Sequence, residues 1–174
     1  VIARKQIHEL IAFLKENSDA FHESALISVA VDIGIRESRK LKGVHILTGD
    51  EIINCTRFSD SIALGNYDID IHSPDGSGTR RVKMRDGTFY TIPYRATIPL
   101  GCDNLLVVGR ALSSTHEAQS SYRILPNVAS IGKGAGIALS LCHKLKCPTY
   151  ALDIPTLAKA IDAYDLVERE EETE

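Results

Sequence analysis

The segment Asn104–Cys142, NLLVVGRALSSTHEAQSSYRILPNVASIGKGAGIALSLC, decides the fold of this chain. It opens with the apolar run Leu105–Val108, which does not alternate and therefore predicts a strand covered on both faces of a largely parallel sheet. Gly109 ends the run. A glycine lets the backbone turn sharply or approach a ligand closely, and open α/β sheets bind ligands at such strand ends. Arg110 adds a positive charge at this point.

Two helices are predicted after this strand. Ser114 and Glu117 have the spacing of a capping box, so a short helix should begin at Ser114 and run through Tyr122. Pro126 cannot continue that helix but suits the first turn of a new one. The second helix should therefore begin near Pro126 and reach about Lys144.

The second helix carries two further signals. Its amino end offers unpaired amides and a partial positive charge to an electron-rich ligand, at Asn127, Val128 and Ala129. Gly132 and Gly136 lie four residues apart on one face, where each glycine costs ~1 kcal/mol relative to alanine. This spacing predicts that another backbone packs closely against that face.

The rest of the chain predicts a mixed succession of helices and strands. Helices are expected over residues 3–16, 48–54, 59–63 and 155–167, from apolar periodicity and capping residues. Strands are expected over residues 25–33, 67–72, 82–84 and 89–92, with a turn at residues 74–78 and a hairpin turn at Asp86-Gly87. The charged end, Glu168 to Glu174, is expected to fray.

Composition narrows the class of protein. The chain has 174 residues, 44% of them hydrophobic, and a formal net charge of −3, which argues against nucleic-acid or anionic-membrane partners. No apolar run reaches the ~18 residues of a membrane-spanning helix. The four cysteines are scattered, so reduced thiols and a cytoplasmic location are expected. Cys142, His143 and Cys147 lack a fourth ligand, and no metal site is predicted.

Four sequence blocks together resemble the carboxyl-terminal part of the bacterial FAD-dependent oxidoreductases, in the glutathione-reductase-like superfamily. They are Gly34–Arg39 with Leu47-Thr48, Ile69–His72 with residues 74–76, Ile92–Arg95, and Asn104–Gly136. The resemblance implies a mixed α/β fold in three parts. Residues 1–100 would belong to the sheet of a substrate-binding domain. Residues 101–146 would supply the last strand and helix of a Rossmann-like FAD-binding domain, and residues 147–174 a C-terminal helix and an acidic tail.

The resemblance also implies cofactor contacts. Gly109 and Arg110 match the strand end beside the ribityl chain or pyrophosphate of FAD. The amides of Asn127, Val128 and Ala129 would lie near the N1 and O2 edge of the flavin, where they would stabilise the negative charge of its reduced form. The alternative for these positions is a turn glycine, a surface arginine and a plain helix start.

The candidates for substrate chemistry are polar residues of the same blocks. His116 and Arg123 are the candidate catalytic residues, for proton transfer and for binding an anionic group. A structural histidine and a helix-face salt bridge are the alternatives. Arg36 and Arg39 are candidates for a carboxylate clamp, unless they pair with Glu37 and Asp32. The resemblance adds three substrate-side residues without a defined role: His72, Tyr94 and Arg95.

The dinucleotide fingerprint G-x-G-x-x-G is missing, because the glycine cluster Gly132–Gly136 follows no strand and falls inside a helix. The same cluster fails the phosphate-loop pattern, which disfavours a nucleotide hydrolase. Since the chain also begins at Val1, we expect the C-terminal portion of a longer FAD enzyme, inactive and weak in FAD binding when alone. Its expected partners are a small-molecule substrate and the missing N-terminal FAD-binding half, and exposed surface could support a homodimer. The alternative is a noncatalytic ligand-binding or assembly domain that kept the fold.

Overall fold

A computed structural model describes residues 2–73 and 78–171 of the chain, in two compact units that divide after Ile35. In the first unit, α1 (Ile2–Asn17) confirms the predicted helix and is followed by the short 3₁₀ helix η1 (Asp19–Phe21). The expected strand over residues 25–33 is wrong, because this segment has no strand partner and exposes side chains such as Ile27, which is 95% accessible. The turn expected at residues 74–78 lies mostly outside the described residues.

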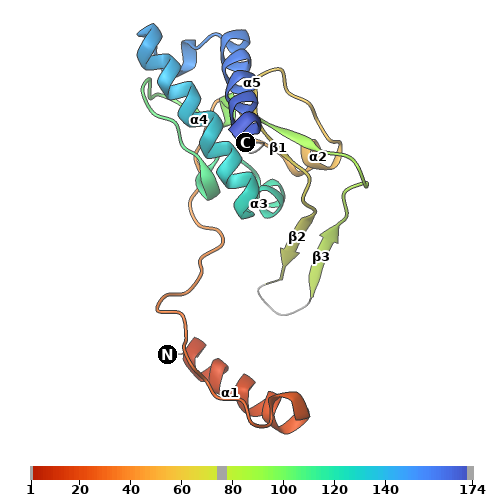
Figure 1. Ribbon diagram of the computed structural model, residues 1–174. Coiled ribbons are helices and arrows are strands. Elements are labelled where there is room, and N and C mark those ends of the chain that lie inside the picture. The colour runs from red at the N-terminus through yellow and green to blue at the C-terminus, as the bar shows by residue number, and fades with distance from the viewer. Residues whose placement is uncertain (1, 74–77, 172–174) are drawn as a thin grey trace. The chain divides into compact units, whose positions relative to one another are not determined.

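The second unit contains the remaining helices and strands (Figure 1). Its helices are α2 (Gly49–Ile53), α3 (His116–Tyr122), α4 (Leu125–Leu145) and α5 (Ile154–Glu171). Its strands are β1 (Ser61–Gly65), β2 (Ile69–His72), β3 (Thr79–Val82) and β4 (Tyr90–Pro93). Three 3₁₀ turns complete it, η2 (Tyr94–Ala96), η3 (Gly109–Ala111) and η4 (Thr149–Ala151). The mixed α/β class expected from the sequence is therefore confirmed, and the domain boundaries at residues 100 and 146 stay a prediction.

The strands form two small antiparallel pairs rather than a parallel sheet. β1 pairs with β4 and β2 pairs with β3, so Asp86-Gly87 connects two different sheets and is not a hairpin turn. In Figure 1 the β2–β3 pair extends away from β1 and β4. Leu105–Val108 is extended but unpaired, apart from the Val107 amide, which donates to the Thr97 carbonyl at 2.8 Å. The predicted buried strand is thus wrong for the described chain, and Leu105 is 47% exposed.

The segment at residues 59–63 is another correction, because it forms β1 where a helix was expected. Asp60 does not cap a helix here. Its carboxylate accepts hydrogen bonds from the backbone amide and the guanidinium of Arg95, at 3.1 and 2.6 Å. Pairing with β4 and this ion pair outweigh the helix propensity of a five-residue segment, since short helices gain little by themselves.

Helix boundaries follow the capping chemistry with one shift. Thr48 and Glu51 form the capping box that begins α2, as expected. The N-cap of α3 is Thr115 and not Ser114, because the Ser114 hydroxyl is buried against the Tyr122 hydroxyl at 2.8 Å. At the end of the chain, α5 continues to Glu171, so fraying from residue 168 is wrong for the described residues.

The core of this unit forms where α4 packs on β1. Gly134 makes this contact, because a Cβ there would lie 2.4 Å from the Ile62 carbonyl oxygen. The expectation of close packing at Gly132 and Gly136 is wrong, since a Cβ at either would meet nothing within 4 Å. The largest fully buried aliphatic side chains are those of Leu47, Ile52, Ile69, Ile92, Leu112, Ile131 and Leu157.

No single helix in the described part of the chain is both long and apolar enough to cross a bilayer. Helices α3 and α4 reach that length and apolarity only when taken together, and they meet at a bend of 95°.

Candidate functional site

The site begins at the junction of η3 and the amino end of α4. Gly109 has a φ of +72°, which favours glycine, and it directly follows the extended run Leu105–Val108. A Cβ at Gly109 would lie 3.8 Å from Cγ1 of Val128 and would meet no other described atom within 4 Å. Two segments that the sequence connected only by motif therefore lie side by side, with open space above the glycine backbone.

The first turn of α4 is arranged as the sequence predicted, with two corrections. The N-cap is Ile124, and Pro126 occupies the first turn. The amide of Asn127 falls in this turn, where no intrahelical acceptor exists. The Val128 amide, which was expected to be unpaired, donates to the Ile124 carbonyl at 3.0 Å. The Val128 side chain faces Gly109. Ala129 is the fifth residue of α4, so its amide also has an intrahelical acceptor and is not available to a ligand as expected.

The side chain of Asn127 serves the core rather than the helix end. It is buried, and its Nδ2 donates to the Tyr90 hydroxyl at 3.3 Å. The same hydroxyl lies 2.8 Å from Oγ of Ser121, at the end of α3. This network ties the first turn of α4 to β4 and α3, so it fixes the direction in which the helix end points.

A cavity of about 400 Å³ opens beside this junction and is rich in arginine. Its lining residues are Arg36, Tyr67, Asp70, His72, Arg110, Arg123, Ile124 and Leu125. Four of them, Arg36, His72, Arg110 and Arg123, were candidate site residues in the sequence, assigned to substrate, cofactor and catalysis separately. The fold gathers them into one place, which we call the arginine pocket.

Each arginine reaches the pocket from a different segment. Arg36 is the first residue of the second unit, and the side-chain amide of Gln119 in α3 donates to its carbonyl at 2.7 Å. Arg110 lies in η3, directly after Gly109. Arg123 is the C-cap of α3, and its Nη2 donates to the Asp70 carbonyl of β2 at 3.2 Å. The pocket is thus a tertiary feature, since no two of these residues are neighbours in one element.

His116 is held by a carboxylate at the start of α3. Its Nδ1 contacts Oε2 of Glu37, whose other oxygen accepts from Lys40 Nζ at 2.5 Å. Burial alone would raise the pKa of Glu37, but the hydrogen bonds from Lys40 and His116 outweigh it and lower that pKa. The imidazole is 52% exposed, so it is oriented by Glu37 and still accessible.

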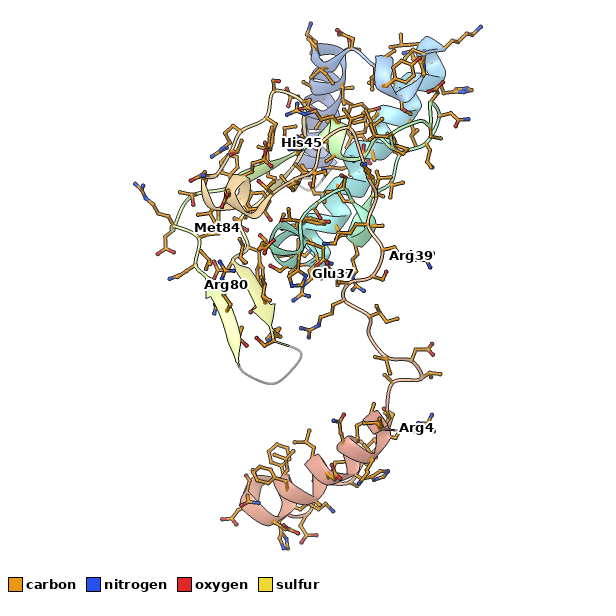
Figure 2. The ribbon with its side chains drawn as sticks, turned by 180° about the vertical axis from the view of Figure 1, so that it is seen from behind. Arg4, Glu37, Arg39, His45, Arg80 and Met84 are labelled. Carbon is orange, nitrogen blue, oxygen red and sulfur yellow. The ribbon has the colours of Figure 1, made fainter. Side chains whose placement is uncertain are left out.

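Of the five candidate substrate-binding residues, three do not line the arginine pocket: Arg39, Arg95 and Tyr94. Arg39 is exposed, and Figure 2 shows it pointing away from the side on which Glu37 meets α3. The described structure places Arg36 in the arginine pocket but not Arg39, so their carboxylate clamp stays a prediction, and Lys40 is a cation that pairs with Glu37. Arg95 pairs with Asp60.

Tyr94 is the third, and it belongs to the core. Its side chain is buried, its hydroxyl donates to the Thr149 carbonyl at 2.8 Å, and burial raises its pKa. Tyr94 therefore anchors η4 to the core and does not line the arginine pocket.

Sequence reasoning missed Asp70 and Tyr67 in the lining and Glu37 as the partner of His116. Asp70 had a usable signal, because it lies two residues before His72 and alternate strand residues share one face. Its side chain approaches His72 Nε2 at 3.3 Å. Glu37 had none, since 79 positions separate it from His116.

A scan against protein-family models matches residues 1–161 to the FAD dependent oxidoreductase family. The chain belongs to this family. The match includes both segments of the η3–α4 junction and every lining residue of the arginine pocket, so oxidoreductase chemistry with FAD is the family-level activity. No curated protein and no solved structure matches the chain.

Proposed function

We propose that this protein acts in hydride transfer between an organic substrate and FAD, with the flavin at the η3–α4 junction. The observation that carries the proposal is the juxtaposition of Gly109 with the first turn of α4. Gly109 has no side chain, and among the described residues a Cβ at this position would meet only Val128 within 4 Å. A planar ring can therefore approach the Gly109 backbone closely. This fits a flavin edge.

The chain's residues have distinct duties in this proposal. FAD, when bound, would supply the hydride chemistry at its flavin ring. The first turn of α4 brings the Asn127 amide and the positive end of the helix dipole to the ligand, where they stabilise negative charge. His116, oriented by Glu37 through Nδ1, presents Nε2 for moving a proton on the substrate.

The remainder of FAD requires a second binding element. The glycine cluster at residues 132–136 lies inside α4, and its middle glycine is packed on β1, so it cannot form a phosphate loop. We infer that a segment outside these 174 residues binds the dinucleotide portion, and that the chain alone binds FAD weakly. The four cysteines are all unpaired, which supports a reducing compartment such as the cytoplasm.

The test is flavin content. The protein produced from its complete gene should purify with FAD visible in its absorption spectrum, and Gly109→Ala should lose most of it because a Cβ obstructs the close approach. Gly101→Ala is the matched control, since Gly101 also has a positive φ, +78°, and a Cβ there would meet no described atom within 4 Å, whereas a Cβ at Gly109 meets Val128 of α4. It imposes the same backbone strain and should keep its FAD.

Two results would overturn the proposal. One is a full-length protein that is colourless and takes up no FAD from excess cofactor, which would favour the noncatalytic alternative. The other is equal FAD content in the Gly109→Ala variant and the wild type, because the flavin would then not approach this backbone.

A further inference from the structure

We propose that the arginine pocket binds the carboxylates of an organic diacid, and that this class of molecule is the substrate of the flavin reaction. The inference deepens the function proposed above. That the diacid is a substrate, and not only a ligand, rests on the proposed function. The binding site itself rests only on the pocket. The family match assigns no ligand to this cavity, and the sequence suggested separate roles for its residues, with Arg110 at the cofactor and Arg36 at a carboxylate.

The charge of the pocket comes first. Three arginines line it, against Asp70 as the acidic residue among the described lining residues. Among the described lining residues the arginines therefore outnumber the carboxylates by two, in a chain whose overall formal charge is −3. Such a local reversal of sign attracts a dianion more strongly than a neutral or singly charged molecule.

Two of the guanidinium groups keep donors available for a ligand. Arg123 gives one hydrogen bond, to a backbone carbonyl, out of five N–H donors. The side chain of Arg36 pairs with no carboxylate within residues 2–73 and 78–171, although its backbone is anchored by Gln119. Guanidinium donors form a planar fork that matches a carboxylate bidentately, and they come here from separate segments. Two such forks suit a ligand with two carboxylates.

The rest of the wall identifies an organic molecule rather than an inorganic ion. Ile124 and Leu125 at the start of α4 and the ring of Tyr67 supply apolar surface. Leu125 is 84% exposed, so its apolar surface is accessible to a ligand in the cavity. A cavity of about 400 Å³ also lies in the range of small-molecule sites. The carbon skeleton of a diacid would cover this apolar side while its carboxylates meet the arginines.

The position of the pocket connects it with the flavin proposal. Arg110 directly follows Gly109, and Leu125 lies in the same helical turn as Asn127. The pocket therefore adjoins the proposed flavin site at both η3 and the first turn of α4. A substrate anchored here by its carboxylates would have its carbon skeleton held next to the ring.

The experiment measures binding of glutarate by isothermal titration calorimetry to the full-length protein, with its neutral diamide and inorganic phosphate as comparison ligands. Glutarate should bind, the diamide should not, and phosphate should bind at least tenfold more weakly. Arg36→Gln and Arg123→Gln should each weaken glutarate binding about tenfold or more, because each removes a charge-assisted hydrogen bond. Arg39→Gln is the matched control, since Arg39 is an exposed arginine three residues away and outside the pocket. It should change the affinity less than twofold.

The outcomes separate this inference from the proposed function. Retained FAD with loss of glutarate binding in the pocket variants supports both. Loss of FAD in those variants overturns the diacid assignment, because the pocket would then hold the cofactor pyrophosphate. Absence of glutarate binding to an FAD-loaded wild type overturns the diacid assignment and leaves the flavin proposal standing. Glutarate binding to a protein that takes up no FAD supports the pocket and overturns its role in flavin chemistry.

Discussion

The glycines on the two faces of α4 differ in how closely another segment packs against them. On one face Gly134 lies so close to β1 that no larger residue fits, whereas Gly132 and Gly136 on the other look onto open space. That open face borders a cavity of about 490 Å³ between α4 and α5, lined in part by Lys133, which also pairs with Asp165 at 2.7 Å. A glycine in a helix therefore marks close packing only where a second backbone actually arrives.

The largest effect is expected at the packed face. Gly134→Ala should lower the free energy of unfolding of the 174-residue chain by about 2–3 kcal/mol, because its Cβ would overlap the Ile62 backbone, which cannot rotate away. Urea denaturation followed by circular dichroism measures the change. An unaltered midpoint would mean that α4 and β1 are not in contact, and the comparison of the two faces would fail.

The loss of stability at alkaline pH tests the packing of the same face of α4. Tyr90 lies beneath the first turn of α4, and burial, partly opposed by hydrogen bonds with Ser121 and Asn127, raises its pKa to about 12. Since the folded pKa lies above the unfolded value of 10.0, the stabilisation is complete below pH 10 and disappears as the pH rises towards 12. The associated loss of unfolding free energy is about 2 kcal/mol.

Tyr90→Phe provides the control for this titration. The variant should be less stable at neutral pH, because Asn127 loses its acceptor, but its stability should fall less steeply between pH 10 and 12. Burial also raises the pKa values of Tyr94 and Tyr122, so these two residues account for the pH dependence of stability that remains in the variant. Identical slopes in the variant and the wild type would show that Tyr90 is accessible to water.

The smallest effect is expected at the open face. Gly132→Ala should raise the stability of the chain by about 1 kcal/mol, because alanine restricts the unfolded backbone and its Cβ meets no described atom within 4 Å. Gly136→Ala should behave in the same way. A loss of stability in either variant would mean that this face is covered, for example by a second copy of the chain, and analytical ultracentrifugation would then show the dimer.

Local chemistry made some of this structure predictable. The capping box of Thr48 with Glu51 and the placement of Pro126 in a first turn depend on neighbours within one turn, so the helix starts of α2 and α4 could be foreseen. The strand β1 could not, because it exists through pairing with β4 some 30 residues later and through the Asp60–Arg95 ion pair.

The candidate site divides in the same way. Gly109 and the start of α4 were singled out from an apolar run, a glycine and a helix start in succession, and the two lie side by side although the apolar run is not a strand. We did not foresee that Glu37 would orient His116 or that Arg36, Arg110 and Arg123 would line one cavity. In both cases the residues come from distant segments. Tyr94 and Arg95 were named from a motif, and the fold uses them to hold its core together.

The sequence by itself determined the helices with strong caps, the mixed α/β class and the family, because these depend on short-range hydrogen bonding and on residue order. Only the tertiary structure decided which glycine of α4 touches a backbone, where the extended run after Asn104 lies, and which arginines share a cavity. Those features arise from contacts between segments far apart in the chain, and nothing in local spacing records which segments will meet.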